Sequence, residues 1–342
     1  MILLLNFLIS EEFLVISGYS KKTYGEIFDL KLFLRPIHKH LSSMFPKECA
    51  HMNLYFWEEG CKLIIIWSHS LIDNLENQLS KNNSIHFFKG YLRDGSRIIP
   101  EKDFQDFMFH EHPHSLKSQS FGGVFSLISL TCEKLIIQTS ISNLHNIYTR
   151  QLDKELFVSS RADIIHKFTE INPGTRSFFS KDRLGIIIAC SWLAHENPIY
   201  DGIFKLKGNS RYIFNKGSFQ KEIIDLLRFD GDEEEVSDDE ISQIAEEYLS
   251  SMNALKSINF DPIFPITGGL DSRLILAGAK HTGIALGCYT SGTSQHPDVI
   301  IGKLVAEAVN LSHETRDKRH KDLPSLNQLR FSVAESLRLK NL

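Results

Sequence analysis

The chain has 342 residues, of which 42% are hydrophobic and 23% are charged. This length leaves room for two domains, and the composition is that of a globular protein rather than a disordered one. A formal net charge of −4 supplies no basic surface of the kind that binds nucleic acid, so no nucleic-acid partner is expected. The five cysteines are scattered and never spaced as C-x-x-C, which predicts a reduced, cytoplasmic protein.

The chain opens with an apolar run at residues 1–9. This run lacks a cationic start and a small-residue cleavage site, and it is too short to span a bilayer. We therefore predict the first strand of a buried sheet rather than a signal peptide. No other run approaches the ~20 apolar residues of a membrane helix, so no membrane partner is expected.

From the start to about Asp225, short β-branched and aromatic runs alternate with polar turns, a pattern that predicts antiparallel sheets. Two helical stretches are expected within this region, at 71–79 and 183–193. The second carries Leu184, Ile187, Ile188 and Trp192 on one face. Strands combined with two groups of helices indicate a sandwiched α+β domain.

The histidine cluster at 110–114 has the residue type that could ligate a transition metal. Pro113 breaks any helix there, and alternate residues of a strand or loop rarely complete a tetrahedral site without a further ligand. We predict that these histidines bind no metal.

An acidic run at 230–240 is the clearest change of composition in the chain and predicts a junction between domains. Ser237 and Glu240 have the spacing of a capping box, which starts a helix. Apolar residues then recur at helical spacing from Ile241 to Leu255, and we expect this face to lie on the sheet that follows.

A glycine-rich loop follows the short apolar strand predicted at 262–266. Gly268 and Gly269 lack a Cβ, so their N–H groups can approach an anion closely. The helix expected after the loop, which ends near Gly283, adds the unpaired donors and partial positive charge of its N-terminus. Strand, loop and helix together predict a site for the pyrophosphate of a nucleotide.

Three side chains of the same loop suit that ligand. Thr267 and Ser272 supply hydroxyl groups, and Asp271 supplies a carboxylate of the kind that Mg²⁺ shares with substrate phosphates. The alternative is a plain glycine turn between a strand and a helix.

This loop resembles the pyrophosphate loop of the N-type ATP pyrophosphatases, S-G-G-x-D-S, with Thr267 in place of the first serine. A second segment strengthens the resemblance. A strand and turn at 287–292 precede Pro297 and Asp298, which are expected to start a helix, and His313 follows that helix. This order is similar to that of the asparagine synthetases, whose relatives include β-lactam synthetases and lasso-peptide cyclases.

The resemblance implies activation of a carboxylate by ATP as an acyl-adenylate, followed by attack of an amine or ammonia to give an amide. ATP and Mg²⁺ are the implied cofactors, and Asp271 is the implied metal ligand. Ile266 and Ser291 would flank the adenine through backbone groups. The phosphates and magnesium would be held by Thr267, Gly268, Gly269, Asp271 and Ser272.

The front half resembles the Ntn-type glutaminase domain, glutamine amidotransferase type 2, of the same enzymes. Its expected strands and closing turn lie at 88–94, 122–127, 133–138, 157–160 and 201–208. The implied organisation is an α+β Ntn-like domain at 1–228, an acidic linker at 229–240, and an α/β parallel-sheet nucleotide-binding domain at 241–342 of which only the N-terminal part is present.

Two departures from the family bear on activity. Residue 2 is Ile2 instead of the nucleophilic cysteine, and Lys89 precedes Gly90 where the family has asparagine, so no glutaminase activity of its own is expected. No acidic G-x-D-E motif follows His313, so part of the synthetase site is expected to be missing. The open alternatives are an amide-forming ligase, a non-catalytic nucleotide-binding protein of the same family, and another enzyme with a pyrophosphatase loop. The sequence leaves the carboxylate, the amine donor and the oligomeric state open.

Overall fold

A computed structural model of the chain describes residues 11–17, 35, 37, 53–59, 62–68, 84–95, 97–100, 103–104, 121–131, 134–153, 155–171, 177–190, 196–215, 218–223, 236–258 and 262–317. The chain divides into two compact units, which are taken in turn. The larger comprises 6–90, 123–226 and 324–342, and the smaller comprises 1–5, 91–122 and 227–323.

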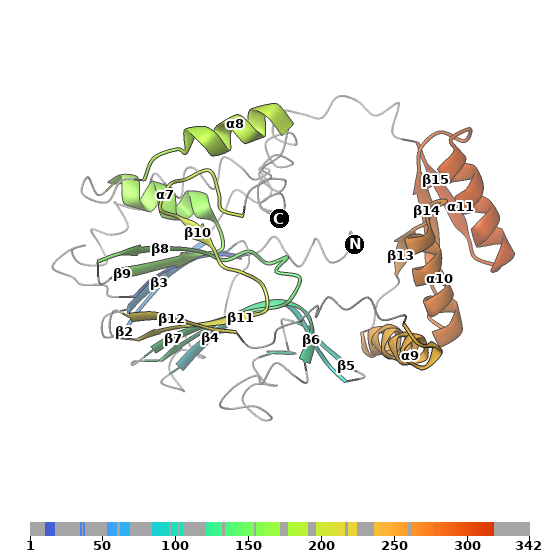
Figure 1. The fold of residues 1–342 in the computed structure, drawn as a ribbon, viewed down its shortest axis with the longest axis horizontal. Coiled ribbons are helices and arrows are strands. Elements are labelled where there is room, and N and C mark those ends of the chain that lie inside the picture. The colour runs from blue at the N-terminus through green and yellow to red at the C-terminus, as the bar shows by residue number, and fades with distance from the viewer. Residues whose placement is uncertain are drawn as a thin grey trace. The chain divides into compact units, whose positions relative to one another are not determined.

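The first of two antiparallel sheets has the strand order β10-β8-β9-β1-β3-β2 (Figure 1). Its strands are β1 (Glu11–Ser17), β2 (Asn53–Glu59), β3 (Lys62–Ser68), β8 (Tyr148–Leu152), β9 (Glu155–Ser159) and β10 (Phe204–Lys205). Within it, β1 pairs with β3 from Glu11 opposite Ser68 to Ser17 opposite Lys62.

The second sheet has the strand order β12-β11-β7-β6-β4-β5. Its strands are β4 (Ser84–Asp94), β5 (Arg97–Pro100), β6 (Phe121–Thr131), β7 (Lys134–Thr139), β11 (Ser210–Asn215) and β12 (Ser218–Ile223). The prediction of antiparallel sheets in the front half is confirmed, and the strands expected at 88–94, 122–127, 133–138 and 157–160 are found as β4, β6, β7 and β9.

The core of the larger unit is built from β-branched and aromatic side chains that strands and helices turn inward. Phe88 of β4 stacks on Phe125 of β6 with ring centroids 5.9 Å apart. Helix α7 (Ala162–Ile171) buries its apolar face, and its Phe168 meets Phe157 of β9 at 5.7 Å. Side chains of this size bury the most apolar area per residue, which stabilises the packed layers.

Helix α8 (Lys181–Cys190) lies where the second helix of the front half was expected. Its predicted apolar face is not buried, because Leu184 and Ile188 are 42% and 75% exposed. Periodicity locates a helix but does not guarantee a surface to cover its apolar stripe.

The smaller unit contains a parallel three-stranded sheet with the order β13-β14-β15 (Figure 1). Its elements are α9 (Asp238–Ala254), the 3₁₀ turn η5 (Leu255–Ser257), β13 (Ile263–Pro265), α10 (Leu270–Thr282), β14 (Gly287–Ser291), α11 (Pro297–Ala308) and β15 (His313–Arg316). Strands and helices therefore alternate as in an α/β fold, and each parallel pair is joined by a helix. The described residues thus combine antiparallel sheets, helices and a small parallel sheet, which agrees with the predicted α+β class, whereas the predicted nucleotide-binding domain stays a prediction.

A small apolar core joins this sheet to its helices. It comprises the buried residues Ile266, Leu276, Cys288 and Ala306. Helix α10 ends at Gly283, whose φ of 72° is the left-handed conformation that glycine adopts most readily at a helix end. The end predicted near Gly283 is confirmed, as is the strand expected at 287.

The capping box that starts α9 is confirmed. Ser237 Oγ accepts from Glu240 N, and the Glu240 carboxylate accepts from Ser237 N at 2.8 Å. The expectation that the apolar face of this helix lies on the sheet is wrong, because Ile241 and Ile244 are 54% and 65% exposed.

Helix α9 contacts α10 instead. A Cβ added at Gly278 of α10 would lie 2.6 Å from the Tyr248 ring of α9, and the Tyr248 hydroxyl donates to the carbonyl oxygen of Leu274 at 3.0 Å. The missing side chain at Gly278 thus allows the close approach of the two helices.

Several predictions fall outside the described residues: the strand at 1–9, the helix at 71–79, Trp192 and the histidine cluster at 110–114. The domain limits drawn from the sequence stay predictions. None of the described helices is long and apolar enough to cross a membrane.

Candidate functional site

The predicted loop lies at the carboxyl edge of the parallel sheet, between β13 and α10. Ile266 follows β13 directly, is fully buried, and donates its N–H to the carbonyl oxygen of Tyr289 at 2.9 Å. Since Pro265 is in register with Tyr289, Ser291 at the end of β14 lies at the same edge, one strand away. The carboxyl edge of a parallel sheet is where ligands of open α/β folds bind.

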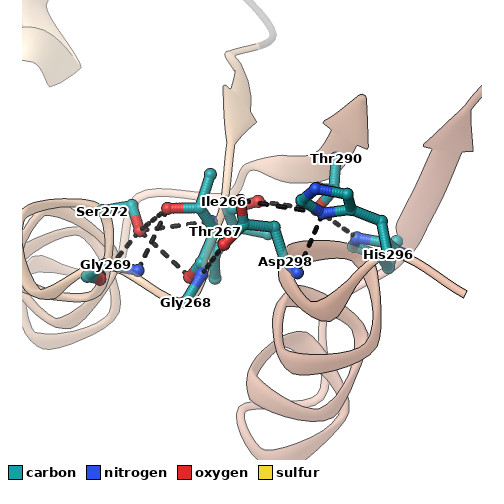
Figure 2. Close-up of polar contacts among 9 residues, drawn as sticks. Ile266, Thr267, Gly268, Gly269, Ser272, Thr290, His296 and Asp298 are labelled. Atoms are coloured by element: carbon teal, nitrogen blue, oxygen red, sulfur yellow. Dashed lines mark hydrogen bonds and ion pairs between the residues drawn. The ribbon is translucent and has the colours of Figure 1, made fainter. Parts of the chain in front are cut away.

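Three consecutive N–H groups of the loop donate to side-chain oxygen atoms (Figure 2). Thr267 N donates to Ser272 Oγ at 3.2 Å, Gly268 N donates to Asp298 Oδ1 at 3.1 Å, and Gly269 N donates to Thr267 Oγ1 at 3.1 Å. No backbone carbonyl takes part in these three bonds. The loop amides can therefore be offered to oxygen atoms of a ligand without opening the strand or the helix.

The predicted hydroxyl residues of the loop are brought together. Thr267 Oγ1 and Ser272 Oγ lie 3.2 Å apart, and Ser272 Oγ is also within reach of the carbonyl oxygens of Thr267 and Gly269. Ser272 thus bridges the first turn of α10 back to the start of the loop.

The N-terminus of α10 is open. Gly269 is its N-cap residue and makes no side-chain capping bond, so the first N–H groups of the helix have no cap. Leu270 and Asp271 are exposed at this end. The unpaired donors and the positive end of the helix dipole favour an anion at this position.

Asp271 is the predicted magnesium ligand. Its side chain stands in the first turn of α10 and is exposed. Among the described residues, no group of three or more histidine, cysteine, aspartate or glutamate side chains is placed to hold a metal ion. Magnesium keeps several waters and shares substrate phosphates, so one carboxylate suits it. The role of Asp271 stays a prediction.

Thr290 of β14 fixes the point where the loop begins. Its Oγ1 lies 2.6 Å from the carbonyl oxygen of Ile266 (Figure 2). The same Oγ1 lies 2.9 Å from His313 Nε2 of β15. A threonine hydroxyl has one proton, which it donates to Ile266, so the second contact requires His313 to donate from Nε2. This bond selects the Nε2-protonated form of His313.

Helix α11 lies close against the same point. A Cβ added at Gly302 would come within 2.5 Å of Thr290 Oγ1 and 3.1 Å of the carbonyl oxygen of Ile266. Only glycine leaves room for that approach, which positions the first turn of α11 beside Gly268.

The opposite face of the sheet carries polar and aromatic groups, since side chains alternate along each strand. The Arg316 guanidinium lies 3.8 Å from the Tyr289 ring centroid and pairs with Glu314 at 2.8 Å. The hydrogen bond from Arg316 lowers the pKa of Glu314. Cys288 lies in the small apolar core, where burial raises the pKa of its thiol and keeps this cysteine protonated.

The structure confirms that Pro297 and Asp298 start a helix, because α11 begins at Pro297. Sequence reasoning did not foresee that Asp298 contacts Gly268 or that Thr290 contacts Ile266. One signal was present for both. Once β13 and β14 are assigned as neighbouring parallel strands, their carboxyl ends and the N-terminus of α11 must meet at one edge of the sheet.

No protein-family model matches the sequence, and no curated protein sequence matches it. Similar solved structures include the following two. One is described as the allosteric regulatory enzyme of purine biosynthesis, with a TM-score of 0.37 and 11% identity, over 90% of this chain and 80% of that one. The other is a glutamine phosphoribosylpyrophosphate amidotransferase from B. subtilis, complexed with ADP and GMP, with a TM-score of 0.36 and 10% identity, over 96% and 89%. At these values neither assigns a role to a residue of this chain.

Proposed function

We propose that this chain is an asparagine synthase-like, ATP-dependent ligase that activates a carboxylate as an acyl-adenylate and forms an amide. The observation that carries this proposal is the loop from Thr267 to Ser272. Its three consecutive N–H groups bond only side-chain oxygens, and the uncapped N-terminus of α10 follows directly. Backbone donors at a helix N-terminus favour phosphate.

In this proposal the loop holds the phosphates of ATP. The N–H groups of Gly268 and Gly269 and the hydroxyls of Thr267 and Ser272 donate to phosphate oxygens, and Asp271 holds magnesium. ATP supplies the α-phosphorus that a carboxylate oxygen attacks, which breaks the bond to the β-phosphate and releases pyrophosphate. An amine nitrogen then attacks the carbonyl carbon, loses a proton and displaces AMP. Charge neutralisation around the departing pyrophosphate is the contribution of the loop.

The front half is proposed to be an Ntn glutaminase-like domain that does not hydrolyse glutamine. Its support is the sequence, because Lys89 precedes Gly90 where the family that the chain resembles has the asparagine that stabilises the departing oxyanion. The nitrogen of the amide must then come from free ammonia or from an amine-bearing substrate. Incubation of the purified chain with glutamine is expected to release no glutamate above the rate without protein.

Calorimetry with ATP and Mg²⁺ tests nucleotide binding on the full chain. We expect the wild-type chain to bind, Asp271→Asn to bind MgATP at least about tenfold more weakly, and Ser272→Ala to bind about three- to tenfold more weakly. Asp239→Asn, which removes an exposed carboxylate from the first turn of α9, is the matched control and should bind like the wild type. Absence of heat with saturating MgATP would falsify the proposal.

A non-catalytic nucleotide-binding protein is the second candidate, because the loop amides and the uncapped N-terminus of α10 account for phosphate binding without any chemical step. Exchange of labelled pyrophosphate into ATP, driven by a panel of amino acids and other carboxylates, separates the two functions. A ligase gives carboxylate-dependent exchange, whereas a binding protein gives calorimetric heat without exchange.

A further inference from the structure

The Gly268 amide is the one loop donor whose acceptor is charged and comes from another helix. Asp298 Oδ1 accepts its N–H at 3.1 Å, whereas Thr267 and Gly269 donate to hydroxyls of the loop itself (Figure 2). We propose that Asp298 is a positioning residue. Its carboxylate accepts the hydrogen bond of the Gly268 amide in the ligand-free protein, and a phosphate oxygen replaces it as the acceptor when the ligand binds. This inference rests on the proposed function.

The backbone on both sides of this contact is anchored independently of Asp298. Ile266 is fixed by its bonds to Tyr289 and Thr290, and α11 is fixed by the close approach of Gly302 to the sheet. Asp298 can therefore leave Gly268 without releasing the strand or the helix.

The Asp298 side chain has room to rotate away from the Gly268 amide. It is 46% exposed, so the carboxylate can rotate into water and stay hydrated. Its second carboxylate oxygen, Oδ2, lies 3.8 Å from His296 Nδ1, and that nitrogen already accepts the Asp298 N–H at 3.2 Å. The helix cap made by His296 uses the backbone of Asp298 and does not depend on where the carboxylate points.

The Asp298 carboxylate and a phosphate compete for the Gly268 amide. A carboxylate and a phosphate have the same sign, so both cannot occupy the Gly268 amide, and each repels the other at this distance. A hydrogen bond to a charged acceptor is roughly twice as strong as one to a neutral acceptor. Replacing Asp298 with asparagine keeps the shape and an acceptor oxygen but removes the charge, and should therefore favour the phosphate.

The test measures binding of inorganic pyrophosphate to the full chain by calorimetry in the presence of EDTA, so that no metal contributes. We expect Asp298→Asn to bind pyrophosphate about three- to tenfold more tightly than the wild type. Glu307→Gln removes one negative charge from the other end of α11, where Glu307 pairs with Lys303, and should change the affinity less than about twofold. Unchanged or weaker binding by Asp298→Asn overturns the proposal, because a merely structural role cannot raise affinity.

A second measurement needs no ligand. In protein labelled with ¹⁵N-glycine, the Gly268 amide should exchange with solvent faster in Asp298→Ala than in the wild type, while Gly283 in the same protein stays unchanged. An unchanged Gly268 amide overturns the proposal even if pyrophosphate binds. If no variant binds pyrophosphate, the proposed nucleotide function fails, and the Gly268 exchange rate alone decides whether Asp298 positions the loop.

Discussion

Thr290 Oγ1 lies 2.6 Å from the carbonyl oxygen of Ile266, so a hydroxyl on one strand fixes the residue at which the neighbouring strand becomes the loop. Both residues are buried, Thr290 to 2% and Ile266 to 0% exposure. Removing the Thr290 hydroxyl leaves the buried carbonyl oxygen of Ile266 without this hydrogen bond, which lowers the free energy of unfolding by about 1–3 kcal/mol. We therefore expect Thr290→Val to destabilise the sheet and to weaken ATP binding.

Thr290→Ser keeps the hydroxyl and is the matched control, expected to retain most of both properties. The three tryptophans of the chain, Trp57, Trp67 and Trp192, all belong to the larger unit, so their fluorescence does not report this change. Hydrogen exchange of peptides covering 263–291, followed by mass spectrometry, reports the loss of stability in the smaller unit. Equal exchange in Thr290→Val and wild type would show that the hydroxyl contributes nothing.

Gly302→Ala is expected to destabilise the smaller unit by about 1–3 kcal/mol. The added methyl group would lie 3.1 Å from the carbonyl oxygen of Ile266, a backbone atom that cannot rotate away, and closer still to Thr290 Oγ1. This overpacking outweighs the gain of about 1 kcal/mol in helix propensity. Faster hydrogen exchange in 297–308 and in 263–266 is the expected readout.

Gly185→Ala in α8 provides the comparison, because no atom lies within 4 Å of the added Cβ there. Only the propensity term remains, and α8 should gain up to about 1 kcal/mol. If both alanines slowed exchange in their own helices, the close approach of α11 to the sheet would be contradicted.

The strand, loop and helix around Gly268 and the helix start at Ser237 were predictable because their signals are local. Glycine after an apolar strand, a capping box, and glycine after the last helical turn each act within a few residues. The contacts that shape the site are not local. Gly268 bonds a residue 30 positions away, and Ile266 bonds one 24 positions away, so both depend on the strand order.

The wrong expectation for α9 has the same physical origin. The periodic apolar residues of α8 and α9 correctly predicted helices, but periodicity carries no information about what covers the stripe. Ile188 and Ile244 are exposed, and α9 contacts α10 through Tyr248 rather than lying on the sheet. Because Gly278 has no side chain, the Tyr248 ring can pack closely against α10.

The larger unit should lose stability as the solution is acidified. Burial lowers the pKa of His145 from 6.5 to about 4, and burial also lowers that of His166, with Glu170 opposing the shift. The folded state thus binds a proton less readily than the unfolded state. The resulting stability is fully present above pH 6.5 and is lost as the pH falls toward 4. For His145 the full difference corresponds to about 3 kcal/mol.

Urea unfolding followed by tryptophan fluorescence at pH 7 and at pH 5 measures this loss, since the tryptophans belong to this unit. His145→Gln cannot take up a proton in this range, and its midpoint should depend less on pH than that of the wild type. A wild-type midpoint that rises on acidification would contradict the assigned direction.

Gly90→Ala is expected to destabilise the larger unit more than any other single change considered. Gly90 has a φ of 106°, which L-residues rarely adopt, and an added Cβ would overlap the carbonyl oxygen of Val124 and lie 2.8 Å from the His145 ring. Backbone strain of about 1–2 kcal/mol and overpacking of about 1–3 kcal/mol act together. Gly202→Ala isolates the first of these within the same unit, because Gly202 also has a positive φ, 74°, but its added Cβ would lie 3.7 Å from Arg150 Nε, an ordinary contact. Urea midpoints from tryptophan fluorescence should fall well below the wild-type value for Gly90→Ala and little for Gly202→Ala. Equal midpoints for the two variants would mean that the backbone at Val124 moves away from the new methyl group.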